Sequence, residues 1–204
     1  MSIERLKEIL AESENIVFFG GAGVSTESNI PDFRSEQGIY RTVTKYGYPP
    51  EIMLSHSFFV RHPKEFFDFY KSSMIFPEAK PNKAHIALAA LEKKGTLKAV
   101  ITQNIDGLHQ MAGSVNVLEL HGSVHRNYCT GCGKNFGLDY VMNSPETVPR
   151  CDKCGNIVRP DVVLYEEPLD SDVLEKSMKY IIKADTLIVG GTSLAVYPAA
   201  GLIN

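Results

Sequence analysis

Apolar residues follow one another along the chain in two patterns, short continuous runs and stripes at helical spacing. Ile16-Val17-Phe18-Phe19 is a continuous run that predicts a buried strand. Residues 3–13 place apolar side chains three and four positions apart, which predicts a helix. The same patterns predict further extended segments at 97–101, 115–120, 157–165 and 186–189, and further helices at 64–72, 82–94, after Asp106 and at 171–183. Residues 35–63 are rich in Gly, Pro, Tyr and Thr, so we expect an irregular covering segment there.

The alternation of strands and helices indicates how these elements pack. Strands that alternate with helices form parallel sheets that are covered on both faces, so we expect an α/β fold with a doubly wound, Rossmann-like parallel sheet. Sheets of this kind bind ligands outside the carboxyl ends of their strands. We expect one site where four polar clusters follow predicted strands, at 20–23, 102–106, 121–122 and 191–193.

The glycine-rich segment Gly21-Ala22-Gly23 follows the first predicted strand. Glycines there let the backbone approach a pyrophosphate, and the amino terminus of a following helix would supply free amides. The third glycine of the usual dinucleotide motif is absent, with Thr26 in its place, and no acidic residue lies at the usual distance. These residues alone fit a phosphate site or an ordinary tight turn, and they argue against an ordinary dehydrogenase.

The four cysteines form two closely spaced pairs, Cys129-x-x-Cys132 and Cys151-x-x-Cys154, separated by eighteen residues. This spacing is typical of zinc ribbons, in which two knuckles each present two thiolates. Four sulfur ligands fill the coordination sphere and leave no position for water, so we expect the zinc to be structural. Free cysteines and an iron-sulfur cluster are the alternatives.

One histidine has a position suited to chemistry. His121 follows a predicted strand at the edge where the ligand site is expected, and a base with a near-neutral pKa is useful there. Asn104 and Asp106 lie at the same edge, but they could equally cap the next helix. No serine or cysteine is paired with a histidine and an acid, so we expect substrate or water to be the nucleophile.

Composition narrows the possible partners and the location. The chain has 204 residues, of which 44% are hydrophobic, and this favours one main domain with a small appendage. Its net charge is −3 and its basic residues are scattered, so we expect neither nucleic acid nor a membrane as a partner. The amino terminus has no signal-peptide run and the cysteines suit a reducing compartment, so we expect a cytoplasmic protein.

Taken in order, five motifs resemble those of the sirtuin family, the NAD-dependent protein lysine deacylases, in a bacterial or archaeal form. The resemblance extends from about Ile16 to the end of the chain. The motifs are Gly21-Ala22-Gly23-Val24-Ser25 leading to Ile30-Pro31-Asp32-Phe33-Arg34, then Thr102-Gln103-Asn104-Ile105-Asp106-Gly107-Leu108-His109, His121-Gly122, the four cysteines, and Gly191-Thr192-Ser193-Leu194.

The resemblance implies a dinucleotide-binding domain with a smaller zinc-binding domain inserted in it. We expect 1–34, 76–122 and 160–204 to form the first, and the segment 35–75 with the zinc ribbon 123–159 to form the second. The implied NAD contacts are Gly21, Ala22, Gly23, Thr26, Asp32, Phe33, Arg34, Gln103, Asn104, Ile105, Asp106, His121, Gly191, Thr192 and Ser193. The implied peptide-binding strand is Val162, Val163, Leu164 and Tyr165.

The resemblance also implies a reaction. The carbonyl oxygen of an acyl-lysine attacks the nicotinamide ribose as nicotinamide leaves, with Asn104 near the ribose. His121 then acts as the general base on a ribose hydroxyl. Phe33 would shield the ribose from water. Water completes the transfer, so the products are free lysine and O-acyl-ADP-ribose. The expected substrates are acetylated proteins or peptides, NAD is the co-substrate, and Zn²⁺ is structural.

The chain departs from the family pattern at several positions. Asn29 and Glu166 stand where many members have glycine, and Asn29 is the residue that best tolerates a left-handed backbone. Members that remove acidic acyl groups have Arg three residues after a Tyr, whereas Ser73 follows Tyr70 here, so we expect uncharged acyl substrates. The family continues beyond Asn204 with a strand over the adenosine, so we expect weak NAD binding.

Two other functions are compatible with the same NAD site. An ADP-ribosyltransferase would pass ADP-ribose to a protein side chain, and label from NAD would then appear on protein. An NAD-sensing module would bind NAD without turnover, and nicotinamide release that requires an acetyl-lysine peptide would exclude it.

Overall fold

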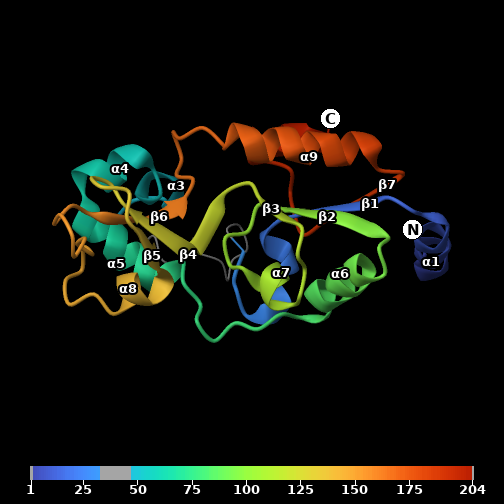
Figure 1. Cartoon of the computed structure of the whole chain (residues 1–204), viewed down its shortest axis with the longest axis horizontal. Helices are drawn as coiled ribbons and strands as arrows, with labels where there is room; N and C mark the ends of the chain where they lie inside the picture. The colour runs from blue at the N-terminus through green and yellow to red at the C-terminus, as the bar shows by residue number, and fades with distance from the viewer. Residues whose placement is uncertain (1, 33–46, 204) are drawn as a thin grey trace.

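The larger sheet has four parallel strands in the order β3-β2-β1-β7 (Figure 1). It belongs to a computed structural model that describes residues 2–32 and 47–203. The strands are β1 (Ile16–Gly20), β2 (Leu97–Thr102), β3 (Val117–Glu119) and β7 (Thr186–Gly190). Continuous apolar runs predicted β1, β2 and β7, and all five residues of β1 are buried.

Helices cover both faces of this sheet, because successive strand side chains point to opposite faces. The covering helices are α1 (Ile3–Glu12), α6 (Lys83–Lys93), α7 (Leu108–Met111) and α9 (Ser171–Lys183). Val17 and Phe19 pack with Val173 of α9, whereas Phe18 packs with Leu88 of α6 on the opposite face. Figure 1 shows α9 on one side of the sheet and α6 with α7 on the other. The predicted doubly wound parallel sheet is therefore confirmed.

The carboxyl ends of the four strands lie level with one another. Gly20 pairs with both Thr102 and Gly190, and Thr102 pairs with Glu119 on its other side. The loops after the strands therefore emerge at one edge of the sheet, which is the arrangement that the ligand rule for parallel sheets requires.

Capping side chains fix where the main helices begin. Asn82 accepts the backbone N–H of Ala84 at the start of α6, as the sequence predicts. Asp170 accepts the N–H of Val173 at the start of α9 in the same way. These caps satisfy amides that have no partner inside the helix. Both helices agree closely with the expected ranges.

A second sheet and a set of helices share a separate apolar core. The sheet is antiparallel in the order β5-β4-β6, with strands β4 (Gly122–Cys129), β5 (Asn135–Gly137) and β6 (Val158–Val162). The helices are α3 (Pro50–Met53), α4 (His56–Arg61), α5 (Pro63–Ser73) and α8 (Leu138–Met142). Phe66, Phe67 and Tyr70 of α5 are fully buried here beside Val124 of β4 and Val158 of β6.

The expected irregular covering segment is wrong over its described part. Helices α3 and α4 occupy residues 50–61, and Ser55 caps α4 by accepting the N–H of Phe58. Prolines at the first turns of α3 and α5 fit helix starts, where an N–H is not needed. The Pro content that suggested irregular structure instead marks helix beginnings.

Two further segments differ from the predictions. The strand expected at 115–120 is shorter, because the Glu92 carboxylate accepts the N–H groups of Val115 and Asn116 and keeps them out of a strand ladder. Residues Ala199–Ile203, for which no element was predicted above, form a 3₁₀ helix. No helix within residues 2–32 and 47–203 combines the length and apolar character that crossing a membrane requires.

Candidate functional site

A cavity of about 680 Å³ lies between the carboxyl edge of the parallel sheet and the second sheet with its helices. Twelve of the predicted NAD contacts line it: Gly21, Ala22, Gly23, Asp32, Gln103, Asn104, Ile105, Asp106, His121, Gly191, Thr192 and Ser193. The predicted peptide-binding residues Val162, Val163, Leu164 and Tyr165 also line it. The four polar clusters thus converge on one site.

Three predicted NAD contacts are not among these lining residues. Phe33 and Arg34 lie outside the described residues. Thr26 is not at the cavity surface, and its hydroxyl donates to the carbonyl of Gly23. That bond stabilises the glycine-rich loop.

The glycine-rich loop packs directly against the loop after β7. The N–H of Gly21 donates to the carbonyl of Gly190, and that of Gly23 donates to the carbonyl of Gly191. A Cβ at Gly23 would come within 2.9 Å of the Cα of Gly191, so only glycine permits this approach. The N–H groups of Gly21 and Gly23 are therefore not available to a ligand, and the helix expected to begin here is a short 3₁₀ helix at Ala22–Val24.

A buried serine joins the glycine-rich loop to the loop after β2. The Ser25 hydroxyl donates to Asp106 Oδ2 at 2.7 Å and accepts from Asn104 Nδ2 at 3.1 Å. Asp106 Oδ1 also accepts the N–H of Leu108, the first residue of α7, although the N-cap position of that helix is Gly107 and not Asp106. Ser25 belongs to the glycine-rich motif, but its position in the sequence did not predict this role.

The start of β4 holds the segment Ile105–Asp106 from the other side. Val124 N–H donates to the carbonyl of Ile105, and His125 Nε2 donates to the carbonyl of Asp106 at 3.0 Å. Gly107 has φ 71°, and a Cβ there would lie 2.7 Å from the His125 ring. Sequence reasoning missed His125, which acts through a contact with a distant loop.

His121 has the geometry of a general base. Its Nδ1 lies 2.9 Å from the carbonyl oxygen of Gln103, and a carbonyl only accepts, so Nδ1 carries the proton and Nε2 keeps a free lone pair. Burial lowers the pKa of His121, and the bond to Gln103 partly raises it again. The imidazole is therefore neutral at pH 7 and able to take a proton at Nε2.

Gly122 connects this base to the second sheet. It has φ 75° and pairs with Val162 across the ladder between β4 and β6. A Cβ at this position would collide with the carbonyl oxygen of Asp161. The carbonyl of His121 itself accepts the N–H of Val163, so His121 and the predicted peptide-binding segment are directly hydrogen-bonded.

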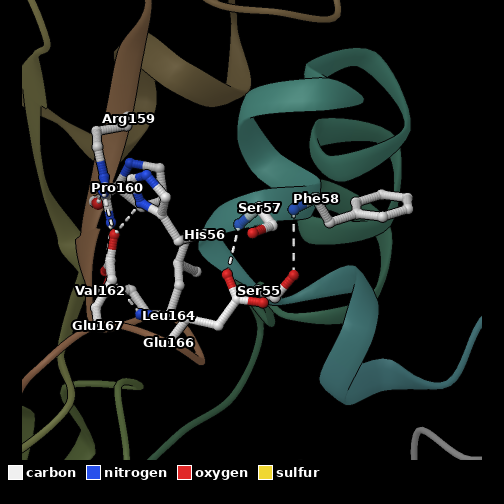
Figure 2. Close-up of polar contacts among 10 residues, drawn as sticks. All are labelled: Ser55, His56, Ser57, Phe58, Arg159, Pro160, Val162, Leu164, Glu166 and Glu167. Carbon is white, nitrogen blue, oxygen red and sulfur yellow. Dashed lines mark hydrogen bonds and ion pairs between the residues drawn. The ribbon is translucent and has the colours of Figure 1, made fainter.

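A buried ion pair fixes the predicted peptide-binding segment (Figure 2). The Arg159 guanidinium donates to both carboxylate oxygens of Glu167, at 2.7 and 3.0 Å, and to the carbonyl of Val162. Glu167 also accepts the N–H of Leu164. Burial raises the pKa of Glu167, but the bonds from Arg159 and Leu164 outweigh it and lower that pKa to about 2. No local pattern in the sequence predicted this pair.

Two buried histidines, one on α6 and one on α7, contact each other. His85 and His109 have ring centroids 4.7 Å apart, and both side chains are almost fully buried. Burial, and secondly the neighbouring His85, lower the pKa of His109 to about 4, although Asp106 opposes this shift. Both rings are therefore neutral at pH 7, and a proton on His109 would be a buried charge.

We expect His109 to make the fold sensitive to acid. The unfolded chain binds this proton below about pH 6.5, whereas the folded chain binds it only near pH 4. The contribution is complete above pH 6.5, and it falls by up to about 3 kcal/mol as the pH drops to 4. Urea unfolding at pH 7, 5.5 and 4.5 should show a shallower loss of stability for His109→Gln than for the wild type. An identical pH slope in the two proteins would contradict this, and exposed His62→Gln is the control.

The four cysteine sulfur atoms form a compact cluster outside the cavity. All lie within 4.8 Å of one another, with Sγ separations of 3.3 Å for Cys129 to Cys154 and 3.7 Å for Cys132 to Cys151. Four sulfurs bound to zinc at about 2.3 Å would lie just under 4 Å apart, so this set fits a tetrahedral zinc. Gly133 supplies a left-handed turn, with φ 68°.

Comparison with known proteins decides the family. The model of the Sir2 family matches residues 21–198. The chain belongs to the Sir2 family. An NAD-dependent protein deacetylase of Clostridium acetobutylicum is 67% identical over 202 residues, which cover 99% of this chain and 82% of that protein. The deacetylase of Cutibacterium acnes is 58% identical over 204 residues, covering 100% of this chain and 83% of that protein.

Solved Sir2 structures have the same fold. One, described as a Sir2 variant with a deacetylated peptide and 3′-O-acetyl ADP ribose, has a TM-score of 0.90 at 45% identity and covers 99% of this chain and 81% of its own. Another, Sir2Tm bound to a propionylated peptide, has a TM-score of 0.86 at 42% identity. This match covers 99% of the present chain and 80% of the Sir2Tm chain. The predicted sirtuin family, NAD-dependent deacetylation and NAD co-substrate are thereby confirmed for this Sir2 chain.

Proposed function

We propose that the cavity residues predicted from the sequence carry out NAD-dependent removal of acetyl or other uncharged acyl groups from protein lysines. The observation that carries this assignment is the position of His121, a neutral imidazole in the same cavity as the loops after β1, β2 and β7. The products are nicotinamide, O-acyl-ADP-ribose and free lysine. The structures of relatives with acylated peptides and acetyl-ADP-ribose support the same reaction.

The loops at the sheet edge would hold NAD. Gln103 Nε2 donates to the Thr192 hydroxyl at 3.0 Å, so two of the proposed contacts support each other. Asp106 is fixed by Ser25 and by the amide of Leu108, which suits it to hold the nicotinamide amide. NAD supplies an activated ribose whose nicotinamide can leave. Gly21 and Gly23 serve this site by allowing the two loops to touch.

His121 and Asn104 are the proposed catalytic residues. His121 Nε2 would accept the proton of a ribose hydroxyl, which makes that oxygen a nucleophile. Asn104 is held by Ser25 and by the Thr102 hydroxyl, so its amide has a fixed position beside the ribose. Nothing in this scheme requires a nucleophile from the protein, which agrees with the sequence.

The acyl-lysine would enter along Val162–Tyr165. The backbone of Tyr165 is bonded to Leu54 and His56, which fixes the segment, and all four of its residues line the cavity, where a peptide strand would lie beside them. Tyr70 and Ser73 line the cavity, and no Lys or Arg lines it within residues 2–32 and 47–203. An acidic acyl group would have no cation to pair with among these residues, so uncharged acyl groups are favoured.

The proposed domain division remains that expected from the sequence, with 1–34, 76–122 and 160–204 binding NAD and 35–75 with 123–159 forming the small domain. Separate apolar cores support it, one on the antiparallel sheet and two on the opposite faces of the parallel sheet. We also propose a cytoplasmic location, which the four free thiols placed for zinc favour. Nucleic acid and membranes are not among the proposed partners.

Mass spectrometry of the products tests this function. The protein would be incubated with NAD and with acetyl-lysine or succinyl-lysine versions of one peptide. We expect O-acetyl-ADP-ribose and nicotinamide, formed faster from the acetyl peptide. Faster turnover of the succinyl peptide would overturn the acyl preference. ADP-ribose attached to protein would indicate a transferase, and nicotinamide release that needs no peptide or never occurs would contradict the deacylase assignment.

A further inference from the structure

A glutamate occupies a position in the cavity wall where its backbone favours glycine. Leu164 to Glu167 form a tight turn in which the N–H of Glu167 donates to the carbonyl of Leu164. Glu166 is the third residue of this turn and has φ 76°. A positive φ at this position is usually supplied by glycine or asparagine, and it is uncommon for other residues. The side chain is therefore present at a conformational cost.

The carboxylate of Glu166 is held in place at the cavity wall. Its Oε2 accepts the N–H of Ser57 at 2.9 Å, at the start of α4. Figure 2 shows Glu166 reaching toward Ser57 while Glu167, next to it, turns toward Arg159. The bonds from Ser57 lower the pKa of Glu166, and the nearby His56 and Arg61 lower it further. Glu166 is exposed and ionised at neutral pH, and it lines the cavity.

The two adjacent carboxylates have different surroundings. Glu167 is half-buried and neutralised by the guanidinium of Arg159. Glu166 forms no ion pair with a described residue within 4 Å, and its charge faces the solvent beside Tyr165. Glu51 adds another carboxylate to the lining of the cavity. The described cavity wall has no Lys or Arg to balance these charges.

We propose that Glu166 is a specificity-determining residue that favours acetyl-lysine peptides with Lys or Arg beside the acetylated residue, and that disfavours peptides with Asp or Glu there. A peptide added along Val162–Tyr165 would pass this carboxylate, because Glu166 directly follows the segment. A fixed charge attracts the opposite charge without further loss of side-chain freedom. This inference rests on the proposed function, and it adds a charge preference to it.

Three acetyl-lysine peptides test the proposal. They share one sequence and differ only in the flanking residues, which are Lys, Ser or Glu. Binding is measured by fluorescence anisotropy and turnover as kcat/KM with NAD. We expect Lys flanks to be favoured over Glu flanks, and Glu166→Gln to reduce that ratio about two- to fivefold, the effect of one exposed ion pair. High salt should reduce the ratio between Lys-flanked and Glu-flanked peptides by a similar factor.

Two further variants make the result specific. Glu166→Lys should reverse the order of the peptides, and the exposed Glu12→Gln on α1, far from the cavity, should leave it unchanged. Thermal melting checks that each variant is folded. An unchanged ratio in folded Glu166→Gln, or a drop of equal size in Glu12→Gln, overturns the proposal. If the wild type deacetylates no peptide, the proposed function fails, and the anisotropy ratios still decide the role of Glu166.

Discussion

Replacing His121 with alanine is expected to abolish deacylation, lowering kcat by about two to four orders of magnitude, the usual contribution of a positioned general base. The reason is the free Nε2 lone pair, which the bond from Nδ1 to Gln103 directs into the cavity. The effect is measured as the turnover of an acetyl-lysine peptide with NAD, which is monitored through the release of O-acetyl-ADP-ribose.

The same variant needs a control, because His121 also holds the loop after β2 through Gln103. NAD binding by calorimetry should be largely retained, which separates loss of the base from collapse of the loop. The exposed His62→Ala serves as a matched substitution away from the cavity. Near-normal turnover of folded His121→Ala would show that another group is the base.

Removing zinc is expected to unfold the small antiparallel sheet, with a loss of several kcal/mol or more. Structural zinc sites contribute about 10 kcal/mol or more of binding free energy, and that energy is lost with the metal. The cysteines join the end of β4 to the segment before β6, beside the ladder in which Cys129 pairs with Val158. Thermal melting with and without a chelator, and after zinc is restored, measures the loss.

The cluster does not line the cavity, so the chelator should not compete with NAD. Raising the NAD concentration should leave the chelator's inhibition unchanged. A Cys132→Ser variant should melt at a lower temperature even without chelator, because one of the four ligands is lost. Inhibition that NAD relieves, or an unchanged melting curve, would contradict a structural metal.

The parallel sheet could be predicted well because its strands carry their own signal. The runs at Ile16–Gly20 and Thr186–Gly190 are apolar and continuous, and every residue of the first is buried, as in a strand covered on both faces. β4 carries no such signal: its burial is irregular, and Cys129 at its end belongs to the metal cluster. Structure that depends on a bound metal and on distant partners is not visible in local periodicity.

The sequence could locate only those parts of the site that directly follow predicted strands. His121 and Asp106 follow strands, so the rule for parallel sheets located them. Ser25, His125 and Arg159 were missed because each acts through a partner that only the folded chain brings near. Ser25 contacts Asp106 across 81 positions of sequence, and no spacing rule reports that contact.

Gly122 has a consequence for how this enzyme can diversify. The residue follows His121 immediately, and its missing side chain allows the carbonyl of Asp161 to approach β4. Any larger residue would push β6 outward, and the proposed peptide-binding wall would move together with the imidazole of His121. The position of His121 and the width of the proposed peptide channel are therefore coupled through this glycine. We expect changes in substrate choice to arise at side chains farther along the wall.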